Sequence, residues 1–335
     1  TAFLARSAGN CRQRRPLNRR EKPMNKQVLG IDTSNYRTSA AVYETETGVW
    51  QNRGRLLDVP EGGIGLRQSE AVFQHTVHLH KMIAALPSNQ PLDAIGVSTR
   101  PRAVEGSYMP CFLAGENVAR AAAHLLGVPL FACSHQQGHI AAAALSAGRL
   151  DLLDREFLAW HLSGGTSELL LVRPGKGGLP ETEIIGGSDD LAAGQLVDRC
   201  GRLFGLPFPA GAELDKLQQT CEAPILAFRP KVKDCWFSLS GVQNQSEMLT
   251  KRGLARRMVA RFAIETVSNA VVEATRQALE RWPLPVLCAG GVMCNSFLRE
   301  QLSQTFECCF AETELSGDNA VGVALLAARQ LGHRE

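Results

Sequence analysis

Apolar residues recur along most of the chain in two patterns, short continuous runs and longer stretches with helical spacing. Short runs bounded by turn residues predict buried strands, whereas apolar residues three or four positions apart predict helices. The runs that predict strands are 28–32, 40–43, 94–98, 129–133, 157–162, 168–172 and 286–289. The stretches that predict helices are 68–86, 116–126, 135–145, 189–205, 253–281, the segment after 295 and 318–331. This alternation indicates an α/β fold in which helices cover the sheets.

Two of the predicted hairpins share one design, in which a polar turn rich in hydroxyl groups joins two strands. The first turn covers residues 33–39 and the second covers residues 163–167. Their separation of about 130 residues suggests an internal duplication. We therefore expect two lobes, formed by residues 24–130 plus 319–335 and by residues 131–318, after a leader of residues 1–25.

The leader is strongly basic. Its charge dominates the net charge of +3, because the first 26 residues hold eight Lys and Arg but one acid. We interpret it as a non-native or upstream-translated segment, with Met24 as the true start; an RNA-binding arm and a targeting peptide are the alternatives. The remaining residues carry more acids than bases. Composition alone therefore does not require a nucleic acid, and a tRNA substrate would need local basic patches or partner subunits.

The chain has 335 residues and is 44% hydrophobic, which suffices for a sizeable core. No apolar run reaches the ~18 residues that a membrane span needs, so we expect no membrane association. The 10 cysteines are scattered and form no Cys-x-x-Cys pair. In a chain of this length they are typical of free thiols in a reducing compartment, and we expect the cytoplasm.

Residues 134–139 read Ser-His-Gln-Gln-Gly-His and lead into an alanine-rich helix. His135 and His139 are four residues apart, so a helix places both imidazoles on one face. Two histidines with this spacing are candidates for a metal site. The alternative is a polar helix start with two solvated histidines. We interpret the other histidines as structural; they include His75, His78, His80 and His161.

Several glycine-containing turns follow predicted strands. The turn at 163–167 and the pair at 290–291 leave backbone N–H groups open to an anion, and the second also precedes a helix. With 186–187 and 210–211, they favour a nucleotide cleft over isolated tight turns. Two acids near these turns, Asp198 and Asp215, could accept hydrogen bonds from ribose or substrate hydroxyls, or could be solvated helix acids.

The loop Arg100-Pro101-Arg102 follows another predicted strand. Two guanidinium groups in a proline-restricted loop suit a phosphate or a carboxylate. A plain surface loop is the alternative.

With these motifs in order, the chain resembles the TsaD family, threonylcarbamoyl transferases of tRNA modification once named O-sialoglycoprotein endopeptidases. The resemblance runs from about residue 26 to about residue 329. His135-x-x-x-His139 is similar to the family's metal-binding His-x-x-x-His, and Asp318-Asn319-Ala320 to its Asp-Asn-Ala/Gly segment. The resemblance implies that Asp318 is the third metal ligand, and that the fold is a duplicated two-lobed ASKHA fold, actin-like or RNase H-like, with a central nucleotide cleft.

Other segments resemble the family's nucleotide and substrate motifs. They are 162–166 (Val-Ser-Gly-Gly-His), 189–198 (Asp-Asp-x3-Gly-x3-Asp), 209–211 (Pro-Gly-Gly), 237–241 (Phe-Ser-Phe-Ser-Gly) and 290–295 (Gly-Gly-Val-x2-Asn). The resemblance assigns nucleotide or substrate binding to Leu162, Ser163, Gly164, Gly165, Thr166, Asp198, Gly211, Asp215 and Asn295. Of these, it places Asp215 near the ribose and Asn295 on the base side.

The chain departs from the family mainly in the first lobe. Tyr36 and Arg37 replace an acidic pair of the first turn, residues 100–102 replace a Gly-Pro-Gly loop, and Thr166 replaces a histidine. The lysine after the Phe-Ser-x-Ser-Gly motif is also missing. We interpret the protein as a divergent paralogue.

The resemblance implies acyl transfer from a threonylcarbamoyl-adenylate to adenosine N6 of tRNA. One divalent ion, Fe or Zn, would polarise the carbonyl, and an adenine nucleotide, threonylcarbamoyl-AMP or ATP, would bind in the cleft. Ser34 and Arg37 of the first hairpin are the catalytic candidates, with Arg100 or Arg102 as further cations for the leaving phosphate. Expected partners are tRNA, through partner subunits, and a paralogous ASKHA subunit. The alternatives are an ATP-dependent carbamoyltransferase that acts on a small molecule, and a non-catalytic nucleotide-binding subunit.

Overall fold

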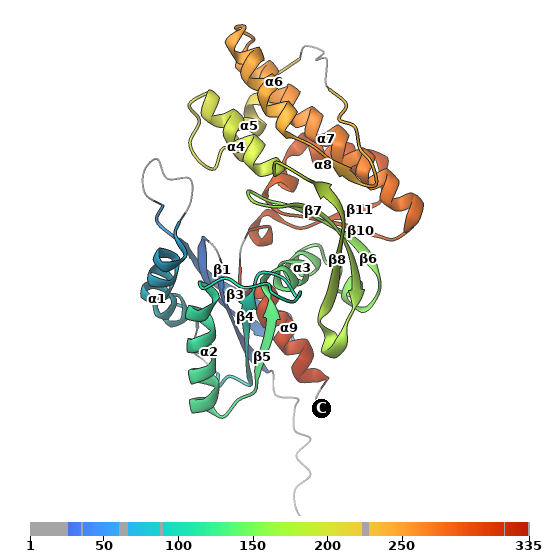
Figure 1. The fold of residues 1–335 in the computed structure, drawn as a ribbon. Helices are drawn as coiled ribbons and strands as arrows, with labels where there is room; N and C mark the ends of the chain where they lie inside the picture. Colours follow the sequence, from blue (N-terminus) through green and yellow to red (C-terminus); the bar gives the residue numbers. More distant parts are fainter. Residues whose placement is uncertain are drawn as a thin grey trace, which may run out of the picture.

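A computed structural model describes residues 26–34, 36–59, 66–87, 90–222, 228–317 and 319–333. Its two lobes are each built on one sheet, with two helices packed between the sheets (Figure 1). The strand order is β3-β2-β1-β4-β5 in the first sheet and β11-β10-β6-β7-β8-β9 in the second. Read from β8, the second sheet repeats the order of the first and adds β9 at its edge. The expected duplicated α/β fold is therefore confirmed.

In the first sheet, β1 pairs antiparallel with β2 and parallel with β4. The strands are β1 (Gln27–Ser34), β2 (Arg37–Glu44), β3 (Trp50–Leu56), β4 (Ala94–Arg100) and β5 (Leu130–Ser134). Every residue of β1 is buried, because helices cover both faces of the sheet. The outer helices are α1 (Gln68–Ala84) and α2 (Phe112–Leu126).

The second sheet repeats this arrangement, since β6 pairs antiparallel with β7 and parallel with β10. Its strands are β6 (Phe157–Leu162), β7 (Ser167–Pro174), β8 (Pro180–Ser188), β9 (Trp236–Phe237), β10 (Val286–Ala289) and β11 (Cys308–Phe310). The helices on its outer side are α4 (Ala193–Leu203), α5 (Gly211–Gln219), α6 (Ser240–Lys251), α7 (Arg256–Arg281) and α8 (Ser296–Thr305). Trp160 of β6 is fully buried in this core and its indole N–H donates to Thr275 of α7 at 2.8 Å.

The helices α3 (His135–Ser146) and α9 (Val321–Gly332) pack against each other between the two sheets. Each follows the fifth strand of its repeat. They cross so closely that a Cβ on Gly322 would lie 1.8 Å from the carbonyl oxygen of Gly138. Because Gly322 has no Cβ, the two helix backbones can come into direct contact. The helix that carries the histidine pair is thus packed directly on the last helix.

Several local expectations need correction. The sequence pattern missed the strands β3, β8, β9 and β11 and the helices α5 and α6. The helix α2 begins four residues before the predicted 116, and α4 begins four residues after the predicted 189. The leader of residues 1–25 and the residue Asp318 lie outside the described residues. The expected lobe boundaries remain a prediction.

Candidate active site

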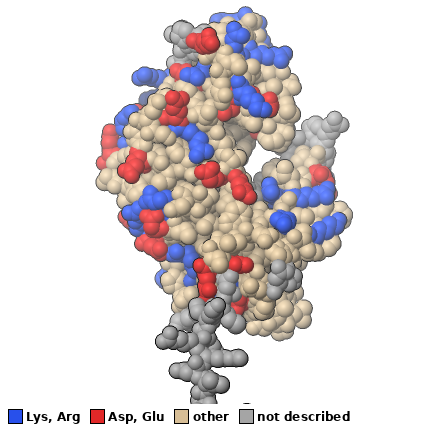
Figure 2. Space-filling model, turned by 180° about the vertical axis from the view of Figure 1, so that it is seen from behind, with Lys and Arg blue, Asp and Glu red and all other residues tan. Residues whose placement is uncertain are grey.

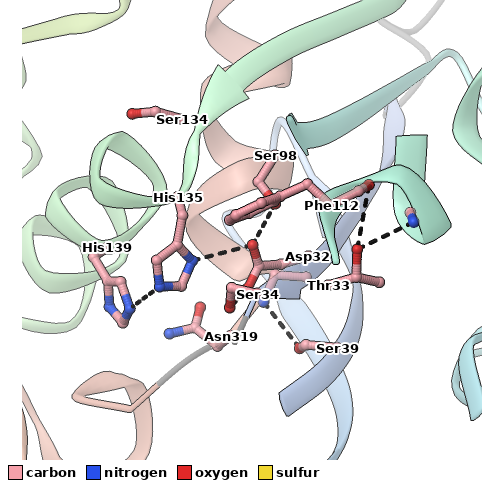
Figure 3. A network of polar contacts seen from close by, with 12 residues as sticks. Asp32, Thr33, Ser34, Ser39, Ser98, Phe112, Ser134, His135, His139 and Asn319 are labelled. Carbon is pink, nitrogen blue, oxygen red and sulfur yellow. Dashed lines mark hydrogen bonds and ion pairs between the residues drawn. The ribbon is translucent and has the colours of Figure 1, made fainter. Parts of the chain in front are cut away.

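The two histidines of α3 point toward each other. His135 is the first residue of the helix and His139 lies one turn later, so their Nε2 atoms are 2.9 Å apart (Figure 3). A capping box fixes the start of the helix: Ser134 accepts from the backbone of Gln137, whose side chain accepts from the backbone N–H of Ser134. The His135 side chain is 19% exposed and His139 is 8% exposed. This burial argues against a pair of solvated histidines.

Asp32 of β1 holds the first of these rings. Its carboxylate is fully buried and lies 3.1 Å from Nδ1 of His135, and it also accepts from the hydroxyls of Ser98 and Ser34 (Figure 3). Burial alone would raise the pKa of Asp32. The His135 ring and the two hydroxyl donors outweigh burial, so the pKa of this carboxyl lies below its ordinary value.

The residues of this pair fit a divalent cation. When Nδ1 of His135 donates to Asp32, Nε2 of the same ring carries a lone pair and faces His139. The two Nε2 atoms are 2.9 Å apart, so one ion could be held by both imidazoles after a small adjustment of the rings. A carboxylate behind a ligating imidazole is also the usual support for such a ligand. Within the described ranges, no group of three or more His, Cys, Asp or Glu is arranged to hold a metal.

The start of α9 lies against the strand pair that carries Asp32. Ser39 of β2 is the register partner of Asp32, and its hydroxyl accepts from the backbone N–H of Ala320 at 3.0 Å. Asn319 is buried and its side-chain oxygen accepts from the backbone N–H of Val321. The first residues of the last helix are therefore fixed close to the carboxylate that holds His135.

His161 is the histidine whose position the sequence did not reveal. It stands on β6 as the register partner of Glu168, and its ring packs against His139 with the ring centres 4.9 Å apart. A narrow cavity beside the two rings is lined by these histidines, Gln136 and apolar side chains of α3 and the second sheet. An imidazole in an otherwise apolar strand is the one signal that could have marked it.

The first hairpin brings both catalytic candidates to the inner face of its sheet. Ser34 and Arg37 are register partners, and Ser34 donates to Asp32 at 2.7 Å. Arg37 lies over β3, where a Cβ on Gly54 would be 2.5 Å from its Nε. That Nε is buried and has no hydrogen-bond partner among the described residues. Ser34 therefore takes part in the Asp32 network, whereas Arg37 extends away from β1 toward β3.

The second hairpin turn lies against two glycines from distant segments. Within the turn, the Ser163 hydroxyl accepts from the backbone N–H groups of Gly165 and Thr166, and the Ser163 N–H donates to the Thr166 carbonyl. A Cβ on Gly194 would lie 2.3 Å from the Ser163 carbonyl oxygen, and one on Gly290 would lie 2.2 Å from that of Leu162. The turn at 162–166, the start of α4 and the end of β10 are thus packed together.

Asp215 and Asn295 meet across the second lobe. The Asn295 amide donates to Asp215 Oδ1 at 2.9 Å, and Ser296 donates to the same carboxylate from its hydroxyl and its backbone. The side-chain oxygen of Asn295 accepts from the N–H of Leu298 and so caps α8. Gln218 adds another donor to Asp215 at 2.9 Å. Asp215 is therefore oriented by its neighbours and is not a freely solvated helix acid.

Asp198 and Asp190 of the Asp-Asp-x3-Gly-x3-Asp segment have different surroundings. Asp198 is half-buried, accepts from the N–H of Ala210 just before Gly211, and has its pKa raised by burial. Asp190 accepts from the hydroxyl of Ser238 and from backbone N–H groups at the start of α6. Burial would raise the pKa of Asp190, but these donors outweigh it and lower the pKa. Asp190 thus ties α6 to the end of β8.

The loop after β4 is tied to the second lobe. Arg102 forms an ion pair with Glu168 of β7, and Glu168 also accepts from Gln136 of α3 at 3.1 Å. The Gln136 side-chain oxygen in turn accepts from Thr182 of β8. Arg100 ends β4 and is exposed. Glu168 and Asp32 are the carboxylates near the histidines that motif reading did not select.

The outer surface carries charges of both signs. Figure 2 shows basic and acidic side chains intermixed over one face, with a hollow between the lobes. Among the helices of the described residues, none is both long and apolar enough to cross a bilayer. No disulfide joins two cysteines within the described ranges.

Comparison with known proteins identifies related sequences over nearly the whole chain. A family model described as TsaD, tRNA N6-adenosine threonylcarbamoyltransferase, matches residues 60–325. A protein of that name from Bacillus licheniformis is 31% identical over 320 residues, with 89% of each sequence covered. Another from Streptococcus thermophilus is 29% identical over 326 residues, which cover 90% of this chain and 91% of the relative.

Solved structures with the same fold are more distant in sequence. HypF of T. kodakarensis has a TM-score of 0.59 at 14% identity and covers 92% of this chain, which spans 48% of that protein. A full-length HypF in the phosphate- and nucleotide-bound form has a TM-score of 0.57 at 12% identity, covering 92% of this chain and 55% of its own. A ROK family glucokinase from Streptomyces griseus gives 0.50 at 12% identity, with 90% and 99% covered. These likenesses concern the fold alone, and they confirm the expected ASKHA fold.

Proposed function

The chain belongs to the TsaD family of tRNA N6-adenosine threonylcarbamoyltransferases, and on that premise we propose that it transfers a threonylcarbamoyl group to adenosine N6 of tRNA. The observation that carries the proposal is the pair of His135 and His139, which Asp32 holds beside a narrow cavity between α3 and the second sheet. In the reaction the N6 nitrogen bonds to the carbonyl carbon of a threonylcarbamoyl-adenylate. The bond from that carbon to the phosphate oxygen breaks, the N6 proton is lost and AMP leaves.

We propose that His135 and His139 hold one divalent ion, Fe or Zn, with Asp318 as the third ligand that the family motif supplies. When bound, such an ion acts as a Lewis acid toward the carbonyl and phosphate oxygens of the donor. Asp32 fixes the His135 ring with Nε2 turned toward His139, where the ion would bind, and Asp32 itself accepts from the hydroxyls of Ser34 and Ser98.

The nucleotide part of the donor would lie against the second lobe. The glycines leave the backbone of the 162–166 turn open to a phosphate group, whose oxygens would replace the Ser163 hydroxyl as acceptor of the Gly165 and Thr166 N–H groups. The Asp215 carboxylate suits a sugar hydroxyl, because its Oδ1 atom already accepts from three side chains whereas Oδ2 accepts from one backbone N–H. Asp198 and Gly211 would complete the substrate side of the cleft. Arg37 would contribute positive charge from the first lobe.

We propose that tRNA is bound together with partner subunits, one of them a paralogue with the same fold. The support for this is the surface charge, because acidic side chains lie among the basic ones over most of the face in Figure 2. A protein that binds a polyanion alone usually carries a continuous basic surface. We propose that this reaction takes place in the cytoplasm.

The direct test is mass spectrometry of tRNA nucleosides from cells with and without this protein. We expect the threonylcarbamoyladenosine mark to fall when the protein is removed and to return with the wild-type gene but not with His139→Ala. If the mark is unchanged in the deletion, tRNA is not the acceptor, and assays of carbamoyl transfer to small molecules become the next experiment.

Elemental analysis of the purified protein tests the ion separately. We expect His139→Ala to lower bound metal severalfold, because one of its two described imidazole ligands is removed. A matched control is His80→Ala, since His80 is exposed on α1. Equal metal content in His139→Ala and the control would refute the site.

A further inference from the structure

One cation beside the candidate site is already neutralised by the protein itself. The guanidinium of Arg102 in the loop after β4 is paired with Glu168, which starts β7 with Ser167. The Arg102 side chain is 42% exposed, whereas that of Glu168 is 12% exposed. The pair therefore has one accessible member and one largely shielded member, unlike a solvated surface pair.

The position of this pair is fixed from both lobes. The Pro101 carbonyl accepts from the N–H of Gln136 at 3.0 Å, so the loop rests on the first turn of α3, one residue from His135. The Arg102 N–H donates to the Ser107 hydroxyl at 3.0 Å. Glu168 stands two residues beyond Thr166 of the second turn. Arg102 thus lies between the histidine helix and the turn that suits phosphate.

The carboxylate of Glu168 is costly to keep ionised because it is largely shielded from water. Burial raises the pKa of its carboxyl, and the Arg102 guanidinium and the Gln136 amide offset that effect only in part. A buried carboxylate of this kind costs free energy to keep ionised. Gln136 would remain bonded to Glu168 if Arg102 moved away, because it donates to the other oxygen of the carboxylate.

We propose that Arg102 binds a phosphate group of the nucleotide, and that Glu168 occupies Arg102 as a substitute anion in the ligand-free protein. The inference rests on the proposed function in that it takes the nucleotide to lie against the 162–166 turn. On binding, Arg102 exchanges one acceptor for another, with no bond made or broken beyond these hydrogen bonds. Arg102 then favours donors that carry a phosphate group. The strength of the ion pair between Arg102 and Glu168 determines how tightly that phosphate must bind to displace Glu168.

This arrangement predicts opposite effects for the two members of one ion pair. Arg102→Ala removes a charge-assisted contact to phosphate and weakens binding. Glu168→Gln removes the competing carboxylate, keeps the side-chain shape and strengthens binding. A purely structural tie between the lobes would respond in one direction, because either change would loosen it equally.

The experiment is isothermal titration calorimetry of the full chain with ATP, adenosine and inorganic tripolyphosphate at fixed ionic strength. We expect Arg102→Ala to weaken ATP and tripolyphosphate about tenfold and Glu168→Gln to tighten both about threefold. Adenosine affinity should change by less than about twofold in either variant, since adenosine carries no phosphate. Arg120→Ala on α2 is the matched control, because it breaks an ion pair with Glu116 away from the cleft. Thermal unfolding of each variant verifies that it is folded.

The possible outcomes separate the inference from the proposed function. If the wild type binds tripolyphosphate but not adenosine, and the two variants still shift in opposite directions, the nucleotide assignment fails and the role of Arg102 holds. If both variants weaken binding of all probes by the same factor, the pair is a structural tie and the inference is wrong. Absence of tripolyphosphate and ATP binding to the wild type also overturns it.

Discussion

The crossing of α3 and α9 makes Gly322→Ala the most direct test of the structure. The added Cβ would lie 1.8 Å from the Gly138 carbonyl oxygen and 2.8 Å from the backbone nitrogen of Ala142. Ordinary contact begins near 3.4 Å, so the helices must separate by about 1.5 Å. Both neighbours are backbone atoms, which cannot rotate away as a side chain could.

The magnitude follows from two opposing terms. Overpacking of a close contact costs about 1–3 kcal/mol, and the upper end applies because backbone must move. Replacing glycine by alanine inside a helix increases the stability of the folded protein by up to about 1 kcal/mol, which opposes this cost. We therefore expect Gly322→Ala to lower the free energy of unfolding by about 2 kcal/mol or more.

A matched control exists on the same helix. Gly332 ends α9, and a Cβ there would meet nothing within 4 Å. We expect Gly332→Ala to be neutral or stabilising by less than about 1 kcal/mol. The assay is urea unfolding followed by circular dichroism, with the stability taken from the midpoint and slope. If Gly322→Ala is as stable as Gly332→Ala, the two helices do not touch as described.

Three further predictions concern buried or hydrogen-bonded polar groups. Asp32→Asn should weaken Co²⁺ or Zn²⁺ binding about 10–100-fold in a competition titration, because it removes the carboxylate behind His135; unchanged affinity would exclude that role. Thr33→Val should cost about 2 kcal/mol of stability in urea, since its buried hydroxyl serves two backbone groups of the α2 region, and a cost near zero would contradict those bonds. Asp190→Ala should lower the free energy of unfolding by about 2 kcal/mol at neutral pH, allowing for the exposure of this carboxylate. The control Asp189→Ala should change it by almost nothing. Since the pKa of Asp190 is lowered in the folded protein, its contribution is present above the ordinary value of about 3.9 and lost as the pH falls further; a constant difference between pH 7 and pH 3 would be inconsistent with it.

Most strands predicted from sequence are almost fully buried. Residues 28–32 and 286–289 are continuous apolar runs, and β1 and β10 contain them. The strand β3 was missed because it is an edge strand whose exposed positions hold Arg53 and Arg55. The strand β8 begins with Pro180 and carries exposed glutamates at Glu181 and Glu183. Proline and glutamate both have a low strand propensity, so the sequence does not predict a strand there. The buried strands were predicted and the exposed ones were missed. How deeply a strand is buried depends on neighbouring elements, which its own sequence does not show.

At the site, the histidine pair was predictable because its geometry is local, fixed by four residues of helix. Asp32 was not, since it lies 103 residues from His135 and meets it only after the sheet and α3 have packed. One clue was available: an aspartate in an apolar strand needs a partner when buried. Glu168 and Arg102 are 66 residues apart, and the motifs on either side of them gave no sign that they pair.

The crossing helices also begin near each other, α3 at His135 and α9 at Val321, beside the strand pair of Asp32 and Ser39. Helix starts carry partial positive charge, so the proposed metal ion would meet electrostatic repulsion there. An incoming anion relieves that repulsion. Metal and anionic donor should consequently bind with positive heterotropic cooperativity, each raising the affinity of the other by the same factor.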